Sequence, residues 1–163
     1  MRVLIAVDGS KPCDELVKDL AARPWNGSDE FMVLHVVSTP DTNEWQDYGL
    51  SVWPELKQKM LAAANDLVES KLNYLRSQMS PTITITSKVA EGHVCDSIVQ
   101  EAKDWHADLI VLAARGHSAL ERFFLGTVAD GVLKKTSCSV EVFKTRRSSR
   151  ANHQNLERAL ESA

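Results

Sequence analysis

The chain has 163 residues, which suits one domain and leaves no room for two full hydrophobic cores. Its hydrophobic fraction of 44% and charged fraction of 25% lie near the averages of globular proteins, so fibrous and disordered classes are poor interpretations. A formal net charge of −3 argues against a general basic surface for nucleic acid. No run approaches the roughly 18 apolar residues needed to cross a bilayer, and the first residues lack a signal-peptide pattern. We therefore expect a cytoplasmic protein that binds neither membranes nor nucleic acid.

Strands and helices alternate along the first half of the chain. In order, the pattern predicts a strand at Val3–Val7, a helix opened by Ser10 or Lys11-Pro12 and stopped by Arg23-Pro24, a strand at Phe31–Val37 and a helix from Pro54 to about Met79. Both strands are short apolar runs, as in a parallel sheet covered on both faces. Ser10 is interpreted as a helix cap rather than as a nucleophile. Residues 38–53 lack periodicity and predict a long loop, in which Trp45 and Trp53 either cover a ligand or pack on the sheet edge.

The second half continues the alternation. In order, it predicts a strand at Thr82–Val89, a helix from Val94 to about His106, a strand at Leu109–Ala113, a helix at Thr127–Lys135 and a strand at Val140–Phe143. The first of these strands alternates apolar with polar residues, which is typical of a sheet edge. Because right-handed crossovers turn such alternation into a parallel sheet, the fold class expected is α/β, a single doubly wound, Rossmann-like sheet of five strands. Ligands of such folds bind beyond the carboxyl ends of the strands, where the strand order reverses.

The end of the chain differs from the rest. From residue 145 onward four arginines face two glutamates, a net charge of +2 in a chain that is negative overall. We therefore divide the chain into an α/β domain at residues 1–144 and a partly flexible basic tail at residues 145–163. The tail is interpreted as a solvated end, with a basic arm as the alternative.

No pattern in the chain predicts a catalytic residue or a metal site. Cys13, Cys95 and Cys138 are expected to be reduced thiols, because their spacing suits neither disulfides nor metal ligation. None of the five histidines has ligand spacing with acids or cysteines. His35, on an apolar strand, is interpreted as a hydrogen-bonded core residue. The P-loop, the dinucleotide fingerprint and the Gly-x-Ser-x-Gly elbow are absent, so we expect no enzyme activity.

The segment after the Leu109–Ala113 strand has the chemistry of an anion site. Arg115, Gly116 and His117 follow the strand, and Gly126-Thr127 opens the next helix. A glycine loop at a helix start offers unpaired N–H groups and the positive end of the helix dipole, which together hold a phosphate. On this pattern alone, the Gly-Thr start suits an ordinary helix cap equally well.

The spacing of these glycines resembles the Gly-x2-Gly-x9-Gly-Ser/Thr pattern of the universal stress protein family. The chain has Ala113, Gly116, nine intervening residues and then Gly126-Thr127, so three of the four marked positions match. The similarity spans residues 2–144, with family-like stretches at Val3–Ser10, Leu34–Val37, Ala107–Val111 and Cys138–Val142. The resemblance implies the strand order 3-2-1-4-5. It also implies a stress-response homodimer that is joined through the last strand, at Val140 and Val142.

The ATP-binding members of that family imply a nucleotide site here. The positions carried over are Ala6, Asp8, Val36, Ala113, Arg115, Gly116, His117, Gly126, Thr127 and Val128. By this resemblance, Asp8 would accept from ribose hydroxyls and the Val36 backbone would meet the adenine edge. The glycine segments would wrap the ribose and phosphates of ATP, or of ADP or AMP, with Mg²⁺ bridging phosphate oxygens. The role implied is a nucleotide-binding regulator or adaptor with an unknown protein partner.

Two positions depart from the family pattern. Ala113 replaces a glycine, and Ala129 lacks the hydroxyl that some members offer to phosphate. If Ala113 keeps a negative φ with its methyl pointing aside, binding survives, whereas a positive φ would cost about 1 kcal/mol and shift the loop. Two alternatives stay open: a nucleotide-free interaction protein of the same fold, and a slow ATPase or adenylate-forming enzyme.

Overall fold

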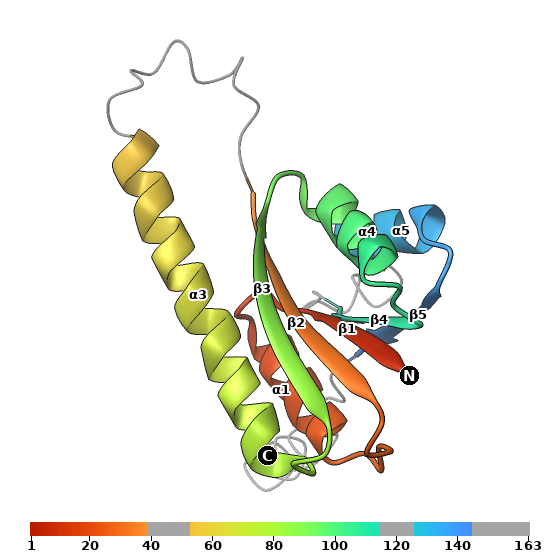
Figure 1. Cartoon of the computed structure of the whole chain (residues 1–163). Helices are drawn as coiled ribbons and strands as arrows, with labels where there is room; N and C mark the ends of the chain where they lie inside the picture. Colours follow the sequence, from red (N-terminus) through yellow and green to blue (C-terminus); the bar gives the residue numbers. More distant parts are fainter. Residues whose placement is uncertain (39–52, 115–125, 145–163) are drawn as a thin grey trace, which may run out of the picture.

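The computed structural model describes residues 1–38, 53–114 and 126–144. Five parallel strands form one sheet in the order β3-β2-β1-β4-β5, as predicted (Figure 1). The strands are β1 (Arg2–Ala6), β2 (Glu30–Val37), β3 (Thr84–Glu91), β4 (Leu109–Ala113) and β5 (Ser139–Phe143). The helices are α1 (Lys11–Ala21), α3 (Trp53–Gln78), α4 (Val94–Asp104) and α5 (Thr127–Lys135). The predictions for the tail, for Trp45 and for residues 115–125 lie outside the described residues.

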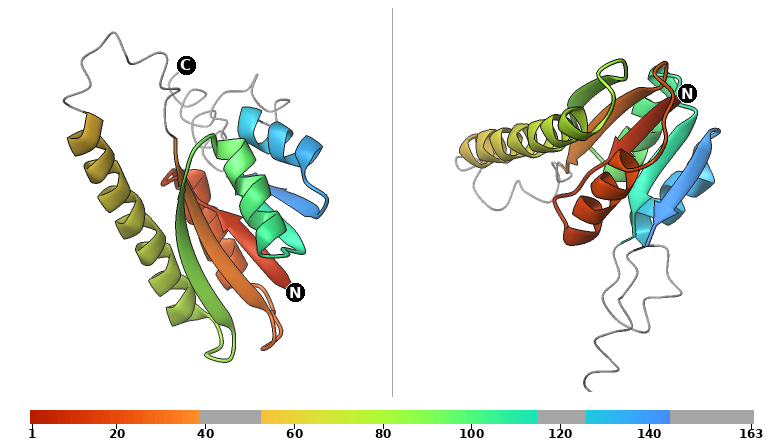
Figure 2. Two further views of the ribbon diagram at one scale, coloured as in Figure 1. Left: turned by 45° about the horizontal axis from the view of Figure 1, so that its top comes forward. Right: turned by 90° about the horizontal axis from the view of Figure 1, so that it is seen from below.

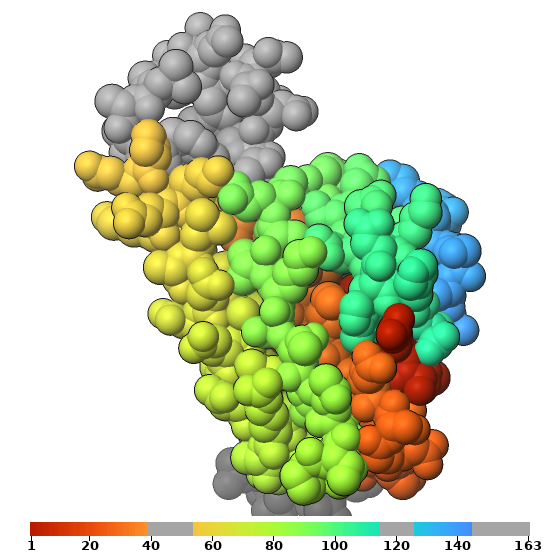
Figure 3. Space-filling model, viewed as in Figure 1, coloured from red at the N-terminus to blue at the C-terminus, as the bar shows by residue number. Residues whose placement is uncertain are grey.

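Helices cover both faces of the sheet. Figure 2 shows α1 and α3 on one face and α4 and α5 on the other, and in Figure 3 α3 and β3 lie side by side along one side of the molecule. The strand β1 lies in the middle of the sheet and is covered on both faces, which explains why the first apolar run contains no polar residue. Val3 and Ile5 pack toward α1 and α3, Leu4 packs toward α4 and α5, and all three are fully buried. In the part of the chain that is described, no helix has both the length and the apolar character that crossing a membrane requires.

Most predicted bounds shift by one or two residues, and the strand Thr82–Val89 shifts by two residues at both of its ends. The strand is an edge strand, as predicted, but it runs from Thr84 to Glu91. It starts later because the Ile83 amide closes a turn on the Ser80 carbonyl, and it ends later because it pairs with β2 as far as Val37. The helix α1 ends at Ala21, with Ala22 as its C-cap, directly before the Arg23-Pro24 pair that was predicted to stop it.

Ser10 caps α1, as predicted. Its hydroxyl oxygen accepts from the Cys13 amide at 3.4 Å, and its backbone is extended, as is usual for a residue that precedes the first helical turn. This cap fixes where the chain leaves β1 and enters α1.

The helix α4 ends with a histidine in a conformation that favours glycine. His106 has a φ of 53° and closes a Schellman motif, in which its amide donates to the Lys103 carbonyl and the Ala107 amide donates to the Ala102 carbonyl. We expect His106→Gly to raise the free energy of unfolding by about 1 kcal/mol, measured by urea denaturation, because glycine has no β-carbon to strain. His106→Ala keeps that β-carbon and should change little. An equal gain in both variants would contradict the backbone explanation.

Candidate functional site

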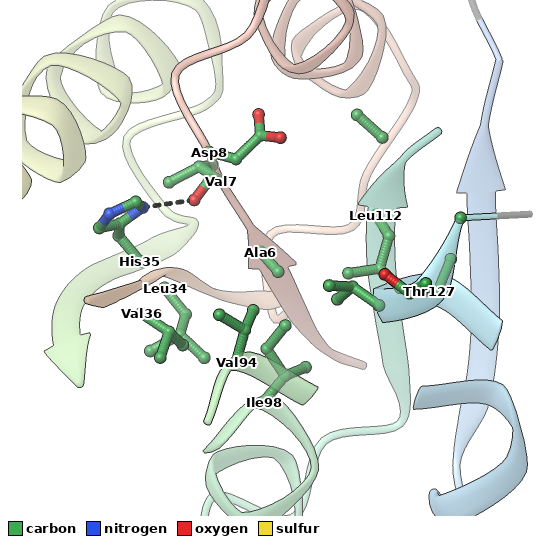
Figure 4. Close-up of a pocket in the computed structure, with 14 residues that line it drawn as sticks. Ala6, Val7, Asp8, Leu34, His35, Val36, Val94, Ile98, Leu112 and Thr127 are labelled. Carbon is green, nitrogen blue, oxygen red and sulfur yellow. Dashed lines mark hydrogen bonds between the residues drawn. The ribbon is translucent and has the colours of Figure 1, made fainter. Parts of the chain in front are cut away.

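A pocket of about 290 Å³ opens at the carboxyl edge of the sheet, on the face covered by α4 and α5 (Figure 4). The pocket lies next to β1, which has β2 on one side and β4 on the other. The strand order reverses at this point, because β2 and β3 lie to one side of β1 and β4 and β5 lie to the other. Its lining residues are Ala6, Val7, Asp8, Leu34, His35, Val36, Val94, Ile98, Leu112, Ala113, Gly126, Thr127, Val128 and Ala129. This is the crevice in which doubly wound folds bind their ligands.

The structure brings together every predicted site residue that it describes. These residues are Ala6, Asp8, Val36, Ala113, Gly126, Thr127 and Val128, and all of them line the pocket. The other predicted site residues, Arg115, Gly116 and His117, lie outside the described residues.

Sequence reasoning missed the apolar wall of the pocket. Leu34 from β2, Leu112 from β4, and Val94 and Ile98 from α4 form this wall. All four belong to the hydrophobic cluster between the sheet and the helices α4 and α5, and Leu34, Leu112 and Ile98 are buried there. The period-two alternation that puts Leu34 and Val36 on one face of β2 was the available signal. A wall of this kind suits a flat apolar group, and it offers that group no charged side chain.

The main chain of Val36, in β2, offers polar groups to the pocket. In β2, the residues that bond to β1 alternate with those that bond to β3: the Leu34 carbonyl accepts from the Val7 amide, whereas the Val37 carbonyl accepts from the Gly92 amide. The N–H and C=O of Val36 therefore face the side of β1. The paired register of β1 ends at Ala6 opposite Leu34, and neither Val36 group has a partner among the described residues. Val36 thus presents one donor and one acceptor side by side at the pocket.

The start of α5 forms the opposite wall. Gly126 precedes the helix with φ 79° and ψ 146°, and no side chain caps the helix there. The first helical bond runs from the Asp130 amide to the Gly126 carbonyl, so within the described part of the chain the amides of Thr127 and Val128 have no acceptor. Uncapped amides at the positive end of a helix dipole favour an anion.

Asp8 is held in place where β1 runs into α1. Its Oδ1 accepts from the Ser10 amide at 3.0 Å and from the Ser10 hydroxyl at 2.6 Å. An ionised carboxylate only accepts hydrogen bonds and has room for several. The Ser10 contacts therefore orient the Asp8 carboxylate at the pocket.

Ala113 has the conformation that was expected to permit nucleotide binding, with a φ that is not positive and a methyl group that points aside. Its φ is not positive, since His106 is the only non-glycine residue with positive φ in the described ranges. Its side chain packs against the cluster on the α1 and α3 face, which is the face opposite to the apolar wall. The methyl group that replaces the family glycine therefore points aside.

The remaining chemistry near the pocket is structural. Burial raises the pKa of the Cys13 and Cys95 thiols, which disfavours the nucleophilic thiolate form at neutral pH. Among residues 1–38, 53–114 and 126–144, no group of three or more His, Cys, Asp or Glu is arranged to hold a metal ion. His35 is hydrogen-bonded, as predicted, through its Nδ1 to the Val7 carbonyl at 2.7 Å (Figure 4).

Comparisons with known proteins give the same fold. The model of the universal stress protein family matches residues 1–144. A universal stress protein of Methanocaldococcus jannaschii is 40% identical over 149 residues, which cover 88% of this chain and 81% of that protein.

Solved structures from that family superpose on this chain. A universal stress protein from Archaeoglobus fulgidus has a TM-score of 0.66 at 20% identity, covering 88% of this chain and 98% of the other. An Arabidopsis thaliana family protein with AMP bound has a TM-score of 0.62 at 18% identity, covering 90% and 92%. A universal stress protein in complex with cAMP has a TM-score of 0.55 at 17% identity, covering 90% and 98%. At these identities the likeness concerns the fold.

Proposed function

Since this chain belongs to the universal stress protein family, we propose that its pocket binds ATP and that nucleotide occupancy regulates contact with a protein partner in the cytoplasm. One observation carries this proposal: a donor and an acceptor on Val36 lie in the same pocket as the uncapped amides of α5. The first pair suits a base and the second suits phosphates. Two family structures with bound AMP and cAMP support the choice of an adenine nucleotide.

The pair on Val36 favours adenine over guanine. On its outer edge adenine offers an acceptor, N7, next to a donor, the N6 amino group, whereas guanine offers two acceptors there. One N–H beside one C=O complements the first arrangement and leaves the Val36 carbonyl facing an acceptor in the second. Between base and phosphates, Asp8 would accept from the ribose hydroxyls. Mg²⁺ would be held by phosphate oxygens and water, which is its usual coordination in nucleotide sites.

The test is a titration with ATP and MgCl₂, followed by calorimetry and by thermal denaturation. A ligand that binds only the folded protein raises its stability in proportion to the logarithm of concentration, so the melting temperature should rise steadily with ATP. GTP at the same concentrations is the control and should produce a smaller rise. Unchanged melting at millimolar ATP would defeat the proposal.

The proposed role is regulation rather than turnover. Catalysis needs a base or nucleophile within hydrogen-bond reach of the reacting atoms. The Ser10 hydroxyl, which donates to Asp8, already serves as the cap of α1. A phosphate-release assay on the purified protein should therefore stay at background. Release of phosphate that disappears in Gly126→Asp would instead favour the slow ATPase.

We further propose that two copies pair through β5. In the described part of the sheet, β5 bonds to β4 alone, and Val140 and Val142 are only half-buried. A charge on an edge strand usually discourages pairing, but Glu141 accepts from the Arg23 guanidinium at 2.9 Å, so its charge is matched within the chain. Light scattering at micromolar concentrations should give the mass of a dimer, and a monomer mass throughout would contradict this arrangement.

A further inference from the structure

We propose that His35 is a positioning residue of this pocket: its imidazole occupies the Val7 carbonyl and so keeps the Val36 N–H available to a ligand. The inference deepens the proposed function and rests on it only for the step in which ATP is the ligand. His35 lines the pocket but is not one of the residues of its apolar wall. It lies on the face of β2 opposite to Leu34 and Val36, as Figure 4 shows.

The contact that carries the inference is short and well defined. His35 Nδ1 lies 2.7 Å from the Val7 carbonyl oxygen, and the ring is half-buried. A backbone carbonyl only accepts, so the proton must be on Nδ1. The imidazole is thus a donor to the carbonyl of the first residue after β1, and it is supplied by the neighbouring strand β2.

This donor stands where the ladder between β1 and β2 would otherwise continue. The Val7 amide donates to the Leu34 carbonyl at 2.8 Å, and in a parallel ladder the next bond would run from the Val36 amide to the Val7 carbonyl. No such bond is present among the described residues. With the imidazole bound, the carbonyl of Val7 is satisfied, and the Val36 amide has nothing to pair with inside the sheet.

A second feature of the chain, the conformation of Gly9, leaves the Val36 carbonyl without a partner in the described part of the sheet. Its ladder partner would be the amide of Gly9, but Gly9 has a φ of 73° and turns the chain out of the sheet toward α1. Gly9 and His35 therefore end the same ladder in different ways. Gly9 removes the donor that would meet the Val36 carbonyl, and His35 satisfies the acceptor that would meet the Val36 amide.

The matched variants are His35→Asn and His35→Leu. Asparagine carries an N–H on the atom after Cγ, which is where Nδ1 stands in histidine, and leucine has nearly the same shape without a donor. Amide hydrogen exchange of the nucleotide-free protein, followed by NMR, gives the first readout, with Leu34 as the reference amide inside the ladder. In His35→Leu the Val36 amide should exchange about tenfold more slowly, because it gains the Val7 carbonyl as a partner. His35→Asn should leave it as in the unaltered protein.

The second readout is the dissociation constant for ATP. His35→Leu should bind about tenfold more weakly, which one backbone hydrogen bond of ordinary strength accounts for, and His35→Asn should stay close to the unaltered protein. Equal Val36 exchange in the two variants, or equal ATP affinity, would overturn the positioning role. If no form binds ATP while Val36 exchange still separates leucine from asparagine, the positioning role holds and the proposed function fails.

Discussion

Replacing Gly126 by asparagine and by aspartate is expected to weaken ATP binding in two separable steps. With φ 79° and ψ 146°, this residue holds a conformation that is almost confined to glycine, and any β-carbon there adds about 1–3 kcal/mol of strain. Among the residues that the structure describes, an added β-carbon would meet no atom within 4 Å, so the strain comes from the backbone. The backbone should relax and carry the Thr127 and Val128 amides out of line. We therefore expect Gly126→Asn to lower ATP affinity by about tenfold, measured by calorimetry.

Aspartate has the shape of asparagine and adds a negative charge beside the phosphates, so Gly126→Asp should lose at least about a further tenfold. Adenosine, which has no phosphate, is the control ligand: the two variants should bind it equally. If aspartate weakened adenosine as much as ATP, the phosphates would have to lie away from the start of α5.

Gly131→Ala is expected to destabilise the fold, although alanine is the better helix former. A β-carbon on Gly131 would stand 2.7 Å from Cys95 Sγ, at the point where α5 crosses α4. Cys95 is buried and has a single side-chain torsion, so its sulfur has few places to go. Overpacking of this kind costs about 1–3 kcal/mol, which exceeds the gain in helix propensity of at most about 1 kcal/mol. Urea denaturation should show the net loss.

The control for Gly131→Ala removes the atom that it meets. Cys95→Ala deletes the sulfur, and in that background Gly131→Ala should cost much less or raise stability. Strictly additive changes in the double variant would mean that the sulfur is not what the new methyl group meets.

The sequence predicted the fold well where its signal was local. Leu109–Ala113 and Thr127–Lys135 have the predicted bounds, and each run starts directly after a residue of another kind, Asp108 and Gly126. The strand Thr84–Glu91 was predicted two residues too early, since its bounds depend on where β2 runs beside it. The positive φ of His106 could not be predicted from the sequence, because such a conformation is expected at glycine and this position carries a histidine.

The candidate site divides in the same way. Asp8 was predictable because it directly follows an apolar run, and Gly126 because a Gly-Thr pair opens the next helix. The partner of His35 was not, although its hydrogen bond was expected. Which carbonyl lies within reach depends on the residue at which the β1–β2 ladder stops, and no residue type encodes that point. The apolar wall was hidden because Leu34 and Leu112 look like any other core residues.

The proposed recognition of a base through the main chain of Val36 would leave no signature in the identity of that residue. Isoleucine, leucine or threonine would present the same two atoms, so divergent sequences can drift at position 36 without losing the reading of the base. Inserting or deleting one residue earlier in β2 would be far more damaging. It would turn those atoms toward β3 and leave the amino-acid composition of the strand almost untouched.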